Sequence, residues 1–190
     1  MTATRLVLVR HGQTAWNVEG RYQGQADPPL NAQGKAQAEA LADRLAAAET
    51  QPVGVYASPL RRAWRTAEAI ARRWRLPLRP EPRLMEIHLG SWQGVLAVEI
   101  ARRWPERFAR WEREPWEVRP PGGETLAEVQ QRVNAALDDI LRRHAEETVV
   151  LVAHRLPLAF AKIRFQGLDP LAVRRIPIPN AGYEVIEVPS

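Results

Sequence analysis

The stretch Leu6-Val7-Leu8-Val9-Arg10-His11-Gly12 contains four consecutive apolar residues, followed directly by an arginine, a histidine and a glycine. A short unbroken apolar run is typical of a strand that is buried on both faces in a parallel sheet. Ligands of open α/β sheets bind beyond the carboxyl ends of the strands. The stretch therefore predicts a central strand over residues 6–9, with Arg10 and His11 at the ligand-binding edge.

Outward from this strand, short apolar runs alternate with segments of helical periodicity. Residues 148–153 form another apolar run that ends at His154, and a capping box over residues 125–128 begins a helix to about residue 144. This alternation predicts an α/β fold, a three-layer α/β/α sandwich with a mainly parallel central sheet. Further strands are expected at 53–57, 76–79, 173–178 and 183–188, and further helices at 31–48, 59–74 and after Pro157.

The whole chain, residues 1–190, is expected to form a single domain. With 190 residues, 45% of them hydrophobic, it is long enough to bury a core without disulfides or structural metals. The Trp-rich residues 85–121 are predicted to form a small helical cap insertion that covers part of this domain. The complete lack of cysteine excludes disulfide scaffolds, thiolate metal sites and cysteine nucleophiles.

Hydropathy and charge bear on the compartment of the protein and on its binding partners. Because no apolar run reaches about 18 residues, we expect a soluble, cytoplasmic protein without membrane contact. The net charge is +5, and residues 60–83 contain eight arginines against two glutamates. Arginine-rich helices bind phosphate backbones, so nucleic-acid binding is an alternative function. No aromatic stacking motif is interleaved there, and a solvated helix face explains the charge, so no nucleic-acid partner is expected.

Two histidines and an arginine are expected at the same edge of the sheet. His11 and His154 each follow an apolar strand, and Arg62 occupies the first turn of the helix that begins near Pro59. A cation at the N-terminus of a helix is disfavoured by about 0.3–1 kcal/mol, so Arg62 indicates a nearby anion. A phosphate fits this position, because helix N-termini and guanidinium groups both bind phosphate oxygens.

These residue types are suited to phosphoryl transfer. Neutral His11 is expected to attack phosphorus directly, aimed by a hydrogen bond from its other ring nitrogen to a carbonyl. Arg10, Arg62 and His154 are expected to hold the phosphoryl oxygens. Glu86 is the carboxyl that we place beside the leaving oxygen. A metal site is disfavoured because the flanking arginines would repel a cation, so no cofactor is expected.

Separate blocks of the sequence together form a specific set of motifs. They are Leu8-Val9-Arg10-His11-Gly12-Gln13-Thr14-Ala15-Trp16-Asn17, Arg21-Tyr22-Gln23-Gly24, Ser58-Pro59-Leu60-Arg61-Arg62-Ala63, Glu86-Ile87-His88-Leu89-Gly90, Pro121-Gly122-Gly123-Glu124 and Val152-Ala153-His154. In content and order they resemble the histidine phosphatase superfamily, the phosphoglycerate mutase-like group, over nearly the whole chain. The resemblance implies metal-independent catalysis through a phosphohistidine.

The resemblance also implies a role for individual residues. The catalytic set that it implies is His11 as nucleophile, Arg10, Arg62 and His154 as phosphate ligands, and Glu86 as proton donor, with Asn17, Gln23 and Gly24 assigned to substrate binding. Arg155 departs from the pattern, because the family usually has a glycine after the second histidine. Three alternatives are open for this arginine: it contacts an extra acidic group on the substrate, points into solvent, or crowds the phosphate site. We assign it to substrate binding.

The segment after Glu86 bears on the reaction type. Its sequence resembles the small phosphatases rather than the mutases, which implies a phosphomonoester hydrolase acting on a small phosphorylated metabolite. A bisphosphoglycerate-dependent phosphoglycerate mutase and a non-catalytic phosphoester-binding relative remain alternatives. The tryptophans of residues 85–121 either line a leaving-group pocket or form the core of the cap. The expected partner is a small phosphate ester, and a homodimer is a possible assembly.

Overall fold

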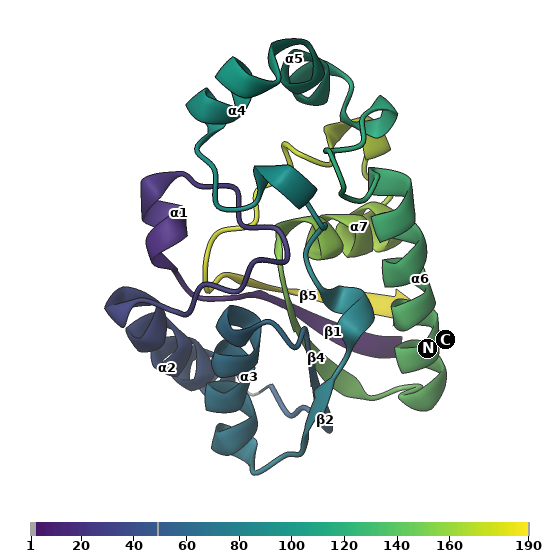
Figure 1. Cartoon of the computed structure of the whole chain (residues 1–190). Helices are drawn as coiled ribbons and strands as arrows, with labels where there is room; N and C mark the ends of the chain where they lie inside the picture. The colour runs from purple at the N-terminus through teal and green to yellow at the C-terminus, as the bar shows by residue number, and fades with distance from the viewer. Residues whose placement is uncertain (1–2, 49, 190) are drawn as a thin grey trace.

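The computed structural model describes residues 3–48 and 50–189 and contains a five-stranded sheet in the order β3-β2-β4-β1-β5. The strands are β1 (Ala3–Arg10), β2 (Gly54–Ala57), β3 (Leu78–Pro80), β4 (Thr148–Ala153) and β5 (Tyr183–Pro189). Neighbouring strands pair in parallel except β5, which runs antiparallel to β1. The sheet lies between helices on both sides (Figure 1), which confirms the predicted fold class.

The register of the two central strands positions the first site residues. Arg10 at the end of β1 lies opposite Ala153 at the end of β4. Because the strands are parallel, the next residue of each, His11 and His154, leaves the sheet at the same edge. The pairing thus brings together two histidines that are separated by more than half of the chain.

Alternate residues of β1 pack on opposite layers of helices. Val7 and Val9 face α2 (Ala32–Ala47) and α3 (Arg61–Trp74), whereas Leu6 and Leu8 face α6 (Leu126–Arg143) and α7 (Arg155–Gln166). All four of these β1 side chains are buried. The continuous apolar run therefore forms a strand with two buried faces, as the sequence predicts.

The N-terminus of α3 is capped by a residue from another segment. Leu60 at the N-cap position makes no side-chain cap, and the backbone N–H of Arg61 donates instead to the Asp27 carboxylate at 2.7 Å. The Arg61 side chain also bonds Asp27. An anion does therefore compensate this helix end, and the loop that contains Asp27 is held against α3.

Residues 85–121 form short helices at one end of the molecule (Figure 1). They contain the 3-10 turns η2 (Gly90–Trp92) and η3 (Pro115–Glu117) and the helices α4 (Ala97–Arg103) and α5 (Pro105–Arg113). The rings of Tyr22, Phe108 and Trp111 pack edge-on around the fully buried Trp92, within 6.4 Å of it or of one another. Trp92 and Trp111 therefore belong to an apolar core.

Two predicted elements differ from the structure. The strand expected at 173–178 is absent from the described residues, which form the turn η4 (Pro170–Ala172) and irregular chain there. The N–H groups of Arg175 and Ile176 instead donate to the carbonyl of Ala172, which closes a local turn, and Pro177 has no N–H to donate to a ladder. Helix α7 begins at Arg155, two residues before Pro157, since a proline in the first turn removes no intrahelical hydrogen bond.

The remaining elements are α1 (Ala15–Glu19) and the turn η1 (Pro82–Leu84). No helix among residues 3–48 and 50–189 is both long and apolar enough to span a lipid bilayer.

Candidate active site

His11 lies at the carboxyl end of β1 with one ring nitrogen fixed by its own backbone neighbourhood. Its Nδ1 is 2.7 Å from the carbonyl oxygen of Gly12, and the side chain is only 3% exposed. A carbonyl can only accept, so Nδ1 carries the proton and the lone pair of the neutral ring is on Nε2. The Gly12 N–H donates to Thr66, which ties this turn to α3.

The surroundings of His11 keep its imidazole uncharged. Burial, together with the positive charges of Arg62 and Arg10, holds the pKa of His11 well below its ordinary value of 6.5. A neutral imidazole with a free Nε2 is the form that can act as a nucleophile.

Arg62 lies in the first turn of α3 and is 1% exposed. It donates to the carbonyl oxygens of Gly24 at 2.6 Å and Ala26 at 2.7 Å, while its buried Nε has no acceptor in the described part of the chain. Burial lowers the pKa of Arg62 to about 10, so the side chain stays charged at neutral pH. A charged guanidinium that lines a pocket is suited to an anionic ligand there.

Arg10 repeats this arrangement on the other side of His11. Its Nη1 donates to the carbonyl of Ile178 at 2.6 Å, and its buried Nε lacks an acceptor among the described residues. Burial also lowers the pKa of Arg10. The segment that was predicted to be a strand therefore supplies, through Ile178, the carbonyl that orients this arginine.

His154 packs directly behind His11. The two rings lie 5.1 Å apart between centroids, and His154 is completely buried. Its Nε2 is 2.7 Å from Ser58 Oγ, whereas Nδ1 has no partner within the described residues. Burial and the charge of Arg62 hold the pKa of His154 well below 6.5. Unlike the other predicted site residues, His154 is not part of the pocket surface.

Glu86 lies in the site near the start of residues 85–121, called the covering segment below. One carboxylate oxygen accepts the backbone N–H of Ile87 at 3.0 Å, and the other lies 3.5 Å from the N–H of Leu156. Arg132 of α6 donates to the carbonyl oxygens of Met85 at 2.6 Å and Glu86 at 3.0 Å. A cation from a distant helix thus fixes the backbone that carries Glu86.

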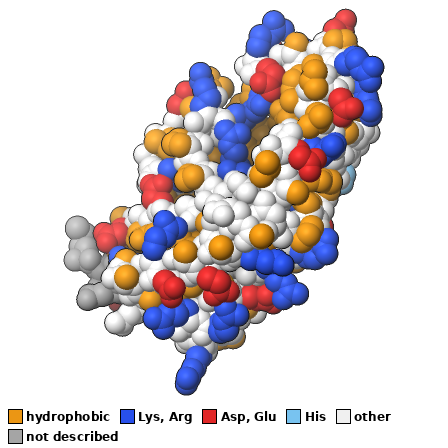
Figure 2. Space-filling model, turned by 90° about the vertical axis from the view of Figure 1, so that its left-hand side faces the viewer, with side chains coloured by type: hydrophobic (Ala, Val, Ile, Leu, Met, Phe, Trp, Pro, Cys, Tyr) orange, Lys and Arg blue, Asp and Glu red, His pale blue; other side chains and the backbone are white. Residues whose placement is uncertain are grey.

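Most of the predicted site residues line one pocket. Its cavity measures about 200 Å³, and Figure 2 shows a hollow in this surface with Lys and Arg side chains inside it. The predicted residues that line it are Arg10, His11, Asn17, Gln23, Gly24, Arg62, Glu86 and Arg155. Asn17 and Gln23 are both held by Thr14, through hydrogen bonds of 3.0 to 3.1 Å. These two amides are therefore fixed in place beside His11.

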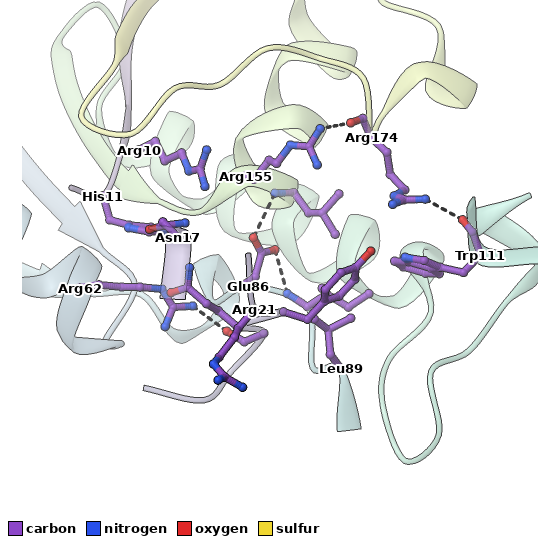
Figure 3. Close-up of a pocket in the computed structure, with 15 residues that line it drawn as sticks. Arg10, His11, Asn17, Arg21, Arg62, Glu86, Leu89, Trp111, Arg155 and Arg174 are labelled. Carbon is purple, nitrogen blue, oxygen red and sulfur yellow. Dashed lines mark hydrogen bonds between the residues drawn. The ribbon is translucent and has the colours of Figure 1, made fainter. Parts of the chain in front are cut away.

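The rest of the wall was not assigned from the sequence. It consists of Arg21, Tyr22, Ile87, Leu89, Trp111, Leu156 and Arg174. Of these residues, only Trp111 was considered from the sequence as a pocket residue. It belongs both to the pocket wall and to the apolar core. Arg174 carries no motif, and its position follows from the turn at residues 170–176. Figure 3 shows Arg10, His11 and Arg62 at one end of the pocket and Trp111 and Arg174 at the other.

The charge of the pocket lining favours an anionic ligand. Five arginines and a single carboxylate line the pocket. No group of three or more histidine, aspartate or glutamate side chains in the described ranges is arranged to hold a metal ion. Guanidinium groups around a neutral imidazole are suited to binding and attacking a phosphoryl group.

The sequence profile of the histidine phosphatase superfamily (branch 1) matches residues 6–190. The chain belongs to this superfamily. The match confirms the resemblance that the motifs carry, and it covers every predicted site residue.

Named members of the histidine phosphatase superfamily are similar to the chain along most of its length. Phosphoserine phosphatase 1 of Hydrogenobacter thermophilus is 40% identical over 184 residues, which cover 97% of this chain and 86% of the relative. Metal-independent phosphoserine phosphatase of Arabidopsis thaliana is 42% identical over 154 residues, which cover 80% and 64%. Both relatives are phosphatases that act on a small phosphorylated metabolite, in agreement with the predicted enzyme class.

A solved histidine phosphatase-like fold is also similar. YhfR of Bacillus stearothermophilus superposes with a TM-score of 0.90 at 36% identity, covering 98% of this chain and 92% of the other. The similarity confirms the mainly parallel sheet flanked by helices as the fold of this superfamily.

Proposed function

We propose that the chain hydrolyses small phosphomonoesters through a phosphohistidine at His11. The observation that carries the proposal is the hydrogen bond from His11 Nδ1 to the Gly12 carbonyl, which leaves the lone pair of the neutral ring on Nε2, between Arg10 and the buried Arg62. The ester phosphate lies in the pocket against the guanidinium groups of Arg10 and Arg62, which line it. These donors neutralise the phosphoryl oxygens and expose phosphorus to the imidazole.

In the first step, the lone pair of His11 Nε2 forms a bond to phosphorus. The bond between phosphorus and the ester oxygen breaks, and its electron pair goes to the leaving oxygen. Glu86 in its protonated form gives a proton to that oxygen, so an alcohol leaves and a phosphohistidine remains. The two arginines hold the charge of the transferring group throughout.

In the second step, water attacks the phosphohistidine. Its proton passes to the Glu86 carboxylate, the nitrogen–phosphorus bond breaks, and the electron pair returns to His11 Nε2. Inorganic phosphate leaves and the enzyme is restored with Glu86 protonated. His154 packs directly behind His11, outside the pocket lining, and keeps the nucleophile in place from that side.

Hydrolysis rather than phosphoryl relocation is supported by the relatives, and the pocket indicates the size of the substrate. The relatives reported above are phosphoserine phosphatases by name. A cavity of about 200 Å³ lies below the ~300–1,000 Å³ of drug-sized ligand sites, so a compact ester fits. Phosphoserine is accordingly one substrate to test, beside other small phosphorylated metabolites.

Ion pairing disfavours nucleic-acid binding by the arginine-rich helix α3 and the segment after it. Most of the arginines between residues 60 and 83 have an acidic partner within 4.0 Å, in the pairs Arg61–Asp27, Arg65–Glu68, Arg72–Glu39, Arg73–Asp43 and Arg83–Glu81. Paired cations release few counterions from a phosphate backbone, so they contribute little to binding. Cytoplasmic location and a homodimer stay predictions.

Acid-quench labelling tests the proposed intermediate. During turnover of a radiolabelled phosphomonoester, an acid-labile, base-stable label is expected on His11 and is expected to be absent in His11→Gln. His88→Gln is the matched control, because His88 lies outside the pocket lining, and it should keep both label and turnover. A chelator should change neither.

Three outcomes would overturn the proposal. Turnover without a label on His11 under single-turnover conditions would exclude the covalent route. Interconversion of phosphoglycerates faster than phosphate release would assign the chain to the mutases. Tight binding of phosphoesters without any turnover would make it a non-catalytic relative.

A further inference from the structure

The five arginines of the pocket differ in how their charge is compensated. Arg21 and Arg174 form ion pairs with Glu19 and Glu112, at the periphery of the pocket. Arg10 and Arg62 flank His11 and are engaged by the phosphoryl group in the proposed function. Arg155 is the remaining one, and no carboxylate lies within 4.0 Å of it in the part of the chain that the structure describes.

Arg155 occupies an unfavourable place for an uncompensated cation. It is the first residue of α7, at the positive end of that helix, and it is half-buried. Burial, and the positive charge of Arg174, lower the pKa of Arg155, whereas Glu86 acts in the opposite direction. Arg155 and Arg10 also repel one another. A cation held among these charges is stabilised by any anion that enters the pocket.

The side chain is also fixed in direction. Arg155 Nη2 donates to the carbonyl oxygen of Arg174, so the guanidinium does not point freely into solvent. Its other N–H groups have no hydrogen-bond acceptor among the described residues. The guanidinium lines the pocket between the His11 end and the Arg174 end (Figure 3). A group bound there belongs to the leaving alcohol rather than to the transferring phosphate.

We propose that Arg155 binds a carboxylate on the alcohol part of the substrate, which makes phosphomonoesters of hydroxy acids the preferred substrate class. This inference rests on the proposed phosphatase function and deepens it. A planar carboxylate matches the guanidinium fork. The cavity measures about 200 Å³, and the phosphate of the substrate must fill part of it, which favours this compact anion over a second phosphoryl group.

Matched substrate pairs test the inference. 3-Phosphoglycerate and glycerol 3-phosphate differ at a carboxylate, as do O-phosphoserine and phosphoethanolamine. We expect wild-type kcat/KM to be at least about 10-fold higher for the acid member of each pair, the equivalent of one charge-assisted hydrogen bond. Arg155→Gln is expected to lower this ratio about 10-fold or more. The ratio within a pair is independent of how much enzyme is folded.

The control is Arg175→Gln. Arg175 is exposed, is the chain neighbour of Arg174 and lies outside the lining of the pocket, so both ratios should stay at the wild-type value. A wild-type ratio near one would overturn the inference. An Arg155→Gln variant whose kcat/KM falls equally for both members of a pair would also overturn it, because that pattern indicates a purely structural role. A preference for bisphosphates that Arg155→Gln abolishes would assign the subsite to a second phosphoryl group instead.

A binding measurement separates failure of the inference from failure of the proposed function. If the wild type hydrolyses neither p-nitrophenyl phosphate nor any substrate of the pairs, the phosphatase proposal fails. Calorimetric titration of the paired compounds into His11→Gln, with and without Arg155→Gln, then still measures the carboxylate preference. Equal affinity for acid and neutral members in the presence of Arg155 would overturn the inference on its own.

Discussion

The imidazole rings of His11 and His154 lie 5.1 Å apart at an interplanar angle of 54°, and both are buried. Two adjacent buried imidazoles beside arginines cannot readily accept protons, and the pKa of each is held well below 6.5 by burial and by the Arg62 charge. The pair is therefore neutral when the protein is folded at neutral pH. This neutrality serves the nucleophile, and it also makes the stability of the fold depend on pH.

The free energy of unfolding is expected to fall as the pH drops through 6.5. In acid the unfolded chain binds more protons at His11 and His154 than the folded one does. The stabilisation is complete above pH 6.5 and is lost between 6.5 and the lower folded-state pKa values, with a slope of about 1.4 kcal/mol per pH unit for each histidine. Urea unfolding between about pH 7.5 and about pH 5.5 measures this slope.

His154→Gln isolates one of the two contributions. Glutamine retains a hydrogen-bonding amide for Ser58 but does not titrate, so the slope should decrease by up to the share of one histidine even if the variant is less stable overall. The carboxylates are the same in both proteins, so the difference between the two slopes reports His154. Identical slopes in the wild type and the variant would contradict the prediction.

Removing the proposed proton donor should affect substrates unequally. Glu86→Gln is expected to lower kcat/KM for alkyl phosphates by about 10²–10⁴-fold, because an alkoxide is a poor leaving group without a proton. The loss for p-nitrophenyl phosphate should be much smaller, since its leaving group needs little protonation. Steady-state kinetics on both substrates check this, and equal losses would move the acid role to another residue.

Arg132 is expected to act as a positioning residue for Glu86. Its guanidinium holds the carbonyls of Met85 and Glu86 and forms an ion pair with Glu124 at 3.0 Å. Arg132→Lys keeps the charge but loses the fork, and a small displacement of the carboxyl is expected to reduce kcat by up to about 10²-fold.

A double-mutant comparison distinguishes this positioning from a general loss of stability. If Arg132 acts through Glu86, then Arg132→Lys should have little further effect on kcat in a Glu86→Gln background. Losses that simply multiply would show that the two residues act independently.

Gly90 is expected to be indispensable for joining the two ends of the covering segment. It has φ +52°, and a Cβ there would lie 2.0 Å from the Pro121 carbonyl oxygen. Gly122 also has a positive φ, of +72°, but a Cβ would meet nothing within 4 Å. Gly122→Ala should therefore cost about 1–2 kcal/mol of backbone strain. Gly90→Ala should cost about 1–3 kcal/mol more because Pro121 must shift.

Denaturant unfolding of the two alanine variants compares these costs. Equal destabilisation would show that the close approach of Gly90 to Pro121 does not constrain the fold. The same variants assayed for kcat report whether the contact also fixes Glu86, which lies four residues before Gly90.

The sequence predicted those parts of the site whose position follows from local pattern. An apolar run buried on both faces indicates a parallel strand, and in such a sheet the residues after Val9 and Ala153 meet at one edge. The cation at the start of α3 indicated an anion there, and Asp27 supplies one to the helix end, while Arg62 itself lines the pocket. The strand expected at 173–178 was wrong because an apolar pattern does not reveal that the backbone N–H groups there close a local turn.

The outer pocket could not be predicted in this way. Arg174 carries no periodic or catalytic pattern, and Tyr22 lies in a motif block that assigns it no role. The two residues line one pocket only because a turn and a loop from opposite ends of the chain pack on the same aromatic core. Arg132 is similar, since on α6 it has the spacing of an ordinary solvated arginine. Only the contact with the Met85 and Glu86 carbonyls distinguishes it.

The amino-acid sequence by itself determined the α/β class, because hydrophobic periodicity acts over a few residues and leaves a readable pattern, and its motif blocks determined the family and predicted the set around His11. Tertiary structure alone decided which ring nitrogen is free, which arginines have acidic partners and what lies beside the leaving group. Those properties depend on burial and on contacts between distant segments, which no local pattern encodes.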